Sequence, residues 1–200
     1  MKKIGILGGT FNPIHTGHLR LAEYARDEFG LDEVWLMPTG CSYLKDADAI
    51  VSAEHRLRMS QLAVTNYPRM KVSDIEIVRQ GNTYTYETLE SLQEQYPDTE
   101  LYFIQGADCL FTIEKWRHPE RIFAACTILA AVRNATSMEA MEAQRNHLEQ
   151  KWGAKVHLLN MPEIQISSTE IRNRLKQDKS VQGMLPEEVI SYIKEKGLYG

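Results

Sequence analysis

The stretch GGTFNPIHTGH, residues 8–18, stands between an apolar run and a helical pattern and decides the fold. Residues 3–7 predict a buried strand, and residues 17–29 place apolar side chains along one side of a predicted helix. Gly8 and Gly9 carry no Cβ, so the backbone can turn tightly there and an anion can come close. The stretch therefore predicts a strand, a turn and a helix in direct succession.

The rest of the chain continues this alternation. The expected strands cover residues 3–7, 33–37, 70–78, 100–104, 127–132 and 155–159. The expected helices cover residues 17–29, 52–66, 85–96, 119–125, 137–152, 168 onward and 186–196. Residues 40–51 read as a loop. Alternating strands and helices predict an α/β fold: a Rossmann-like, doubly wound, mostly parallel sheet with helices on both faces. We expect one domain over residues 1–200, with a C-terminal helical segment, residues 167–200, packed on it.

Ligands of such sheets bind beyond the carboxyl ends of the strands. We therefore expect the residues that follow the strands to converge on one edge of the sheet. These are Gly8-Gly9-Thr10, Pro38-Thr39, Gly106-Ala107-Asp108 and Arg133.

Composition favours small-molecule partners. The net charge is −4, whereas a protein that binds a nucleic acid duplex normally presents a basic face, so we expect no nucleic acid partner. Cys41, Cys109 and Cys126 show no CxxC spacing, which favours reduced thiols in a cytoplasmic protein. No apolar run approaches the ~20 residues that cross a bilayer, and no secretory signal is expected, so we expect no membrane partner. The sequence leaves open whether the protein is a homo-oligomer.

Two histidines give the first stretch its chemistry. Neither GxGxxG nor GxxxxGK[ST] is present, so the two familiar phosphate-binding templates do not apply. Backbone N–H groups of the glycine turn and the positive end of the helix that begins near Gly17 can still attract phosphate. His15 and His18 are three residues apart across that helix start, so both rings can face one side and donate to phosphate oxygens. The pattern predicts a phosphate-binding site.

GGTFNPIHTGH also resembles the signature of the nucleotidyltransferases with a (T/H)xGH motif, here His15-Thr16-Gly17-His18. Within them the chain is most similar to the bacterial nicotinate-nucleotide adenylyltransferases, over nearly its full length. The further matching stretches are NTYTYETL (82–89), FIQGAD (103–108), Lys115-Trp116 and ISSTEIRNRL (166–175). The resemblance implies an enzyme of NAD biosynthesis that joins ATP, its co-substrate, to nicotinate mononucleotide. It also implies Mg2+ held mainly through substrate phosphates, and we expect no metal site built from side chains.

The resemblance assigns roles to individual residues. His15 and His18 would be catalytic, with His18 at the α-phosphate. The residues implied in ATP binding are Gly8, Gly9, Thr10, Phe11, His15, His18, Gly106, Asp108, Arg133, Ser167, Ser168, Thr169 and Arg172. Those implied in mononucleotide binding are Lys45, Tyr84, Thr85 and Trp116. Trp116 could stack on the pyridine ring, and donors at the helix start around Thr85 suit a carboxylate.

Several alternatives stay open. Ser167 and Glu170 form a capping box that would explain ISSTEIR without any ligand, and Thr85 could be a helix N-cap only. Residues 41–45 lack the Pro-Pro-His-Lys loop of many family members, which leaves the contacts of Lys45 in question. A related adenylyl- or cytidylyltransferase with another phosphate acceptor, a synthetase fragment and a non-catalytic nucleotide sensor are the competing functions. His55, His118, His147 and His157 match no metal spacing and are expected at the surface or in packing contacts.

Overall fold

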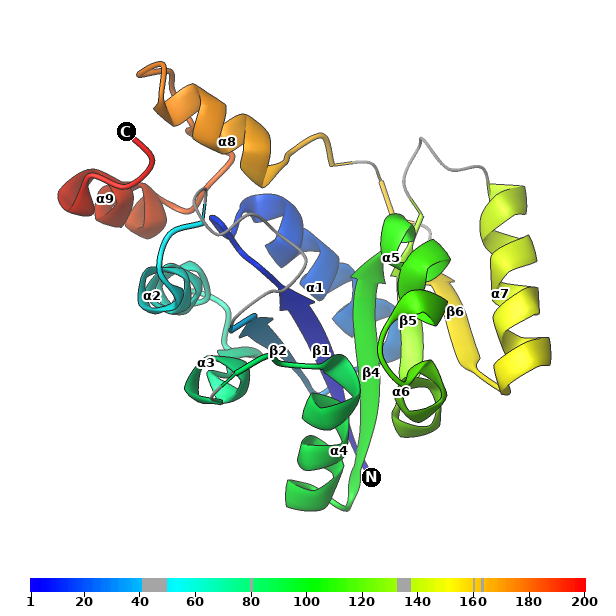
Figure 1. Ribbon diagram of the computed structural model, residues 1–200. Coiled ribbons are helices and arrows are strands. Elements are labelled where there is room, and N and C mark those ends of the chain that lie inside the picture. The colour runs from blue at the N-terminus through cyan, green and yellow to red at the C-terminus, as the bar shows by residue number, and fades with distance from the viewer. Residues whose placement is uncertain (41–49, 80, 133–137, 160, 163) are drawn as a thin grey trace. The chain divides into compact units, whose positions relative to one another are not determined.

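The computed structural model describes residues 1–40, 50–79, 81–132, 138–159, 161–162 and 164–200 (Figure 1). The strands are β1 (Lys2–Gly9), β2 (Glu33–Pro38), β3 (Met70–Val72), β4 (Thr99–Gly106), β5 (Thr127–Ala131) and β6 (Lys155–Leu159). The helices are α1 (Thr16–Phe29), α2 (Ala53–Ala63), α3 (Ile75–Val78), α4 (Thr85–Gln95), α5 (Ala107–Thr112), the 3-10 helix η2 (Ile113–Lys115), α6 (Pro119–Ala125), α7 (Met138–Trp152), α8 (Ser168–Leu175) and α9 (Glu187–Lys196).

The strands form one sheet in the order β3-β2-β1-β4-β5-β6. β1 pairs with β4 in parallel, β4 with β5, and β5 with β6. Helices α4 and α6 lie in front of β4 and β5 in Figure 1, and the second half of α1 lies behind the sheet. From β1 the chain adds β2 and β3 toward one edge of the sheet, and it then adds β4, β5 and β6 toward the other edge, as in doubly wound folds. The expected Rossmann-like α/β fold is confirmed.

The described residues divide into two compact units. Unit 1 comprises Met1–Gly8, Leu21–Trp35 and Tyr84–Glu163, and unit 2 comprises Gly9–Arg20, Leu36–Thr83 and Ile164–Gly200. Each unit has its own fully buried apolar side chains. Those of unit 1 include Ile4, Ile104, Leu110 and Ile128, and those of unit 2 include Ile14, Leu36, Met59 and Ile171. The single domain expected from the sequence stays a prediction.

The expected strand at residues 70–78 is wrong in its second half. β3 ends at Val72, and Ile75–Val78 forms the helical turn α3. The Ser73 hydroxyl accepts the N–H of Ile75, and the carbonyl of Asp74 accepts the N–H groups of Ile77 and Val78. Serine and aspartate side chains favour such local turns over a strand ladder, so local bonding overrides the alternating apolar pattern.

Helix ends follow the expected capping chemistry. The Ser52 side chain accepts the N–H of His55 and caps α2, which ends at Ala63, three residues earlier than expected. Gly30 follows α1 with a φ of 60°, the left-handed conformation in which glycine meets no Cβ penalty. Helix α5 and η2 were not among the expected helices, because residues 106–108 were expected only to follow the strand at the edge of the sheet. The predicted loop over residues 40–51 falls largely outside the described residues.

Candidate active site

The motif loop, residues 10–16, turns later than the sequence predicts. β1 continues through Gly8 and Gly9, so these glycines are extended and do not form the expected tight turn. A Cβ on Gly9 would lie 2.7 Å from Cε1 of Phe11, so Gly9 makes room for that ring. The chain turns at Phe11, which has a φ of 48° and is 2% exposed. A bulky residue rarely adopts this conformation, so neighbouring contacts must hold it there.

The two motif histidines lie face to face at the start of α1. Their ring centroids are 3.7 Å apart with an interplanar angle of 26°, which confirms that both rings share one side. The backbone N–H of His15 donates to Nδ1 of His18 at 3.2 Å. A neutral His18 therefore carries its proton on Nε2, where it can donate to an anion. Phe11 packs edge-on against the His18 ring at 4.9 Å.

The absence of a side chain at Gly17 leaves space for the His15 ring. A Cβ on Gly17 would lie 2.9 Å from Nδ1 and 3.0 Å from Cε1 of His15. His15 is only 4% exposed, so its ring has little room to move. The glycine between the two histidines is therefore required by packing.

Arg56 holds the motif loop from α2, and sequence reasoning missed it. Its guanidinium donates to the carbonyl oxygens of Thr10 at 2.8 Å, Val51 at 3.2 Å and Gly40 at 3.2 Å. The residue is 3% exposed, and carbonyl partners compensate such a buried charge. A sequence pattern could have indicated this role, because Arg56 shares one face of the helix with Met59, Ser60 and Ala63, and that face is buried.

The ISSTEIR stretch combines helix capping with contacts to the motif loop. The Ser167 hydroxyl accepts the N–H of Glu170 at 3.1 Å, so the predicted cap of α8 is present. The Ser168 hydroxyl donates to the carbonyl of Pro13 at 2.9 Å. Arg172 donates to the carbonyl of Asn12 at 2.8 Å and to the Thr169 hydroxyl at 3.2 Å. Capping alone therefore does not account for the stretch, because two of its side chains hold residues just before His15.

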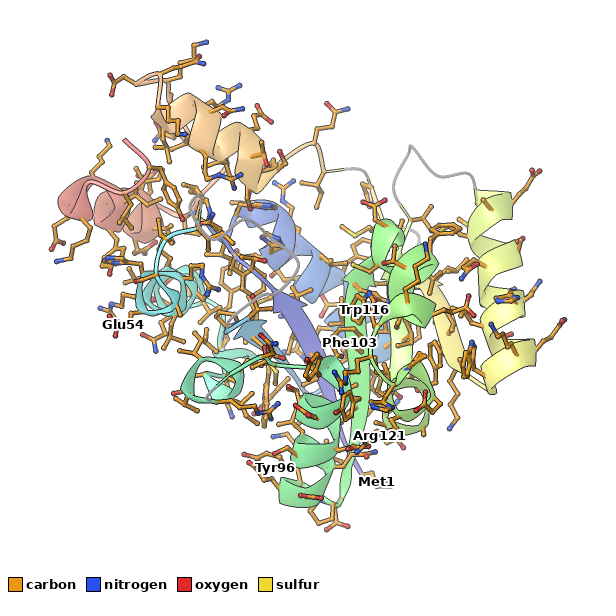
Figure 2. The ribbon with its side chains drawn as sticks, in the orientation of Figure 1. Met1, Glu54, Tyr96, Phe103, Trp116 and Arg121 are labelled. Carbon is orange, nitrogen blue, oxygen red and sulfur yellow. The ribbon has the colours of Figure 1, made fainter. Side chains whose placement is uncertain are left out.

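A second group, the aromatic cluster, lies in unit 1 and comprises Tyr84, Tyr86, Phe103, Trp116 and His118. Trp116 follows η2 and is half-buried, with its ring edge-on to Phe103 at a centroid distance of 6.2 Å. Figure 2 shows the labelled side chains of Phe103, on β4, and Trp116, directly after η2, next to each other. A Cβ on Gly8 would meet only the Phe103 ring, at 3.7 Å. Trp116 therefore keeps part of its aromatic face accessible.

Two arginines cover the tyrosines of the aromatic cluster. The Arg117 guanidinium lies 5.0 Å from the Tyr84 ring centroid, and Arg121 lies 4.3 Å from that of Tyr86. Thr85 is the first residue of α4, whereas the N-cap position is occupied by Tyr84 without a side-chain cap bond. The alternative that Thr85 is only an N-cap is thus wrong, and its hydroxyl stands at a helix start.

Asp108 lies in a helix that the sequence did not predict. Gly106 precedes α5, and Asp108 is exposed in the first turn of that helix. Gly9 and Gly106 end the neighbouring strands β1 and β4, whose register pairs Leu7 with Ile104. The exposed carboxylate is thus placed at the carboxyl end of β4.

The comparisons with known proteins agree with this geometry. A family model described as cytidylyltransferase-like matches residues 6–174. A probable nicotinate-nucleotide adenylyltransferase of Lachnoclostridium phytofermentans is 43% identical over 199 residues, which are 100% of this chain and of that relative. Another of Dehalococcoides mccartyi is 42% identical over 98% of this chain and 97% of its own length. The chain belongs to the nicotinate-nucleotide adenylyltransferases of the cytidylyltransferase-like family.

Solved structures support the fold of this family member. The nicotinic acid mononucleotide adenylyltransferase of Plasmodium falciparum complexed with NaAD has a TM-score of 0.82 at 23% identity, covering 100% of this chain and 98% of that one. A putative nicotinate-nucleotide adenylyltransferase of Vibrio parahaemolyticus has a TM-score of 0.70 at 23% identity, covering 100% of this chain and 96% of that one.

The remaining histidines of this adenylyltransferase family member make surface and packing contacts, as expected. His55 bonds Tyr192 at 2.9 Å, His118 bonds Glu120 at 3.1 Å, and His157 packs at 5.1 Å from the Phe29 ring.

His147 contacts Glu114, a residue of η2. Glu114 accepts bonds from Lys151 at 2.8 Å, Trp152 at 2.9 Å and His147 at 3.1 Å. These bonds, that from Lys151 foremost, lower the pKa of Glu114 to about 2.

Some expected residues cannot be placed. Lys45, Arg133 and Cys41 lie outside the described residues.

Burial raises the pKa of the Cys126 thiol to about 12, which makes it unreactive. Within the described ranges, no three His, Cys, Asp or Glu side chains gather as a metal site. The described helices include none that is both long and apolar enough to span a membrane.

Proposed function

We propose that the protein transfers the adenylyl group of ATP to nicotinate mononucleotide and forms nicotinate adenine dinucleotide and pyrophosphate, a step of NAD biosynthesis. The observation that carries the proposal is the stacked His15–His18 pair at the start of α1. It lies in a chain that is 43% identical, over its whole length, to a relative named for this activity.

The chemistry requires little acid–base help. A phosphate oxygen of the mononucleotide attacks the α-phosphorus of ATP, a new P–O bond forms, and the bond to the bridging oxygen of pyrophosphate breaks. The attacking phosphate monoester has a second pKa of about 6 and is largely dianionic at neutral pH. No side chain has to remove a proton, so the protein's task is to position both substrates and stabilise negative charge.

His18 is suited to the developing charge on the α-phosphate. Because its Nδ1 accepts the His15 N–H, the proton of a neutral His18 is on Nε2, from which it would donate to a phosphate oxygen. Rings stacked at 3.7 Å repel each other when both are protonated, so we assign at most one positive charge to the pair. We assign Gly8, Gly9, Thr10, Phe11, Gly106, Asp108 and Arg133 to the rest of the ATP site.

The ISSTEIR residues would serve the outer phosphates. The N–H groups at the start of α8 and the side chains of Ser168, Thr169 and Arg172 offer several donors close together. Ser168 and Arg172 also donate to the motif loop, so they would hold the loop and the polyphosphate together.

The aromatic cluster is assigned to the mononucleotide. Trp116 is half-buried beside Phe103 and would stack on the pyridine ring. The N–H groups and hydroxyl at Thr85, with Tyr84 beside them, would hold the carboxylate. An amide carries no charge for these donors to balance, so nicotinate is preferred over nicotinamide. Lys45 is assigned to the phosphate of this substrate.

Phosphate oxygens of the substrates would be better ligands for Mg2+ than the side chains of the site. Imidazole, guanidinium and hydroxyl donors of the motif-loop region match phosphate oxygens, whereas Mg2+ prefers oxygen ligands such as phosphates and water. Mg2+ bound to the polyphosphate would neutralise part of its charge, and no side chain is assigned to it. A cytoplasmic location and the oligomeric state stay predictions.

A pyrophosphate-release assay with ATP and Mg2+ tests the proposal. Nicotinate mononucleotide should support turnover, nicotinamide mononucleotide less, and phosphopantetheine none. His18→Ala should remain folded by circular dichroism and lose a factor of about 10²–10³ in kcat. Turnover with phosphopantetheine alone would favour another acceptor, and tight ATP binding without turnover would favour a nucleotide sensor.

A further inference from the structure

Asn12 is the point where three other segments hold the motif loop. Its side-chain oxygen Oδ1 accepts the N–H of Val51 at 3.3 Å and the hydroxyl of Tyr199 at 2.8 Å. Its main-chain oxygen accepts a bond from Arg172 at 2.8 Å. Asn12 is 5% exposed and stands three residues before His15. Donors from three separate parts of unit 2 therefore converge on one residue of the loop.

Tyr199 reaches Asn12 because the chain folds back after α9. Gly197 ends that helix with a φ of 59°, and the N–H of Leu198 returns to the carbonyl of Ile193 at 3.0 Å. Tyr199 itself has a φ of 68°, a conformation that a bulky residue rarely adopts without stabilising contacts. The turn directs the phenol inward. Burial raises the pKa of Tyr199, so its hydroxyl keeps its proton and stays a donor.

We propose that Tyr199 is a positioning residue, which acts through Asn12 to hold the motif loop in the shape that presents His15 and His18 to polyphosphate. The phosphate-binding part of this inference rests on the proposed function. Tyr199 touches neither reacting atoms nor substrate in the proposed mechanism.

The loop between Asn12 and His15 has little slack. Ser168 holds the carbonyl of Pro13, Ile14 is fully buried, and His15 is 4% exposed beside Gly17. A shift at Asn12 therefore has to move the histidines, since close-packed interiors transmit displacement.

The fold itself does not depend on the Tyr199 hydroxyl. Helix α9 has its own buried apolar face, made by Val189, Ile190 and Ile193. The phenylalanine ring of Tyr199→Phe fills the same space, so we expect a folded protein whose Asn12 lacks one donor. A role in stability alone would leave the ligand affinities of this folded variant unchanged.

Three variants of the full chain test the proposal: Tyr199→Phe, Asn12→Leu and, as control, Tyr192→Phe. Tyr199→Phe removes one of the two donors to Oδ1 of Asn12, whereas Asn12→Leu removes the acceptor of both. Tyr192 is another tyrosine of the C-terminal region, and its hydroxyl contacts His55 instead of the motif loop. The first measurement is calorimetric titration with ATP and Mg2+ alone; the second is the steady-state rate with nicotinate mononucleotide.

We expect Tyr199→Phe to bind ATP about tenfold more weakly, the effect of losing one hydrogen bond, and Asn12→Leu, which loses two, to bind ATP at least as weakly. Tyr192→Phe should stay within about twofold of the original protein. In the rate assay, Tyr199→Phe should lower kcat while KM for the mononucleotide stays unchanged. Unaltered ATP affinity in a folded Tyr199→Phe, or absence of ATP binding by the original protein, overturns the inference. If ATP binds as expected but no dinucleotide forms, the proposed acceptor is wrong and the positioning role of Tyr199 stands.

Discussion

Gly17→Ala separates activity from stability. The new Cβ would lie 2.9 Å from Nδ1 of His15, whereas ordinary contact begins near 3.4 Å. The buried ring must therefore retreat by roughly 0.5 Å, because the close-packed interior has no room to absorb the methyl group. Misplacing a catalytic group by about 1 Å can lower the rate about 100-fold, so we expect kcat to fall about tenfold.

The same change has little effect on the free energy of unfolding. Gly17 lies in the first turn of α1, and its φ is outside the left-handed region. Alanine favours a helix over glycine by up to about 1 kcal/mol, which offsets part of the strain at His15. Urea denaturation should place the variant within about 1 kcal/mol of the original protein. Glu28→Ala, an exposed change on the same helix, is the control and should keep both properties.

Full activity in a folded Gly17→Ala would refute the reasoning, because it would mean that the position of the His15 ring does not limit the reaction. A loss of several kcal/mol would also contradict it, since the ring could then not adapt at all.

Three further changes test the other contacts. Arg56→Met leaves three carbonyl oxygens without their charged donor and should lower the free energy of unfolding by about 3–5 kcal/mol in urea titrations; a loss under 1 kcal/mol would contradict this. Gln105 is 4% exposed, and its amide atoms bond none of the described residues, so Gln105→Met should raise the denaturation midpoint by the equivalent of about 1–2 kcal/mol, and a decrease would speak against an unsatisfied amide. Glu114→Gln should cost about 1 kcal/mol at pH 7 after solvent screening. Because the folded pKa of Glu114 is lowered to about 2, its contribution is present above its ordinary pKa of 4.5 and is lost as the pH falls toward 2; a difference from the original protein that persists unchanged near pH 2 would be inconsistent with this.

Regular elements of the fold were predictable because their apolar patterns are long. The strands at β1, β2, β4, β5 and β6 and the longer helices follow from periodicity and from caps such as Ser52. Short elements were not predictable in the same way. α3 depends on bonds at Ser73 and Asp74, and α5 is a helix of six residues that begins directly at the end of β4.

The site was predictable where the residue types and their spacing in the sequence indicate phosphate binding. The spacing of His15 and His18 was enough to place both rings on one side of α1. Arg56 and Tyr199 were missed because they bind oxygen atoms of the motif loop across 46 and 187 residues, and no local pattern marks such partners. The tight turn expected at the glycines was wrong, because the chain turns at Phe11 instead.

A crystal structure with a non-hydrolysable ATP analogue and Mg2+ tests the central claim most directly. We expect an α-phosphate oxygen at about 3 Å from Nε2 of His18, with the outer phosphates at the start of α8. A polyphosphate chain bound well away from both imidazoles would contradict it.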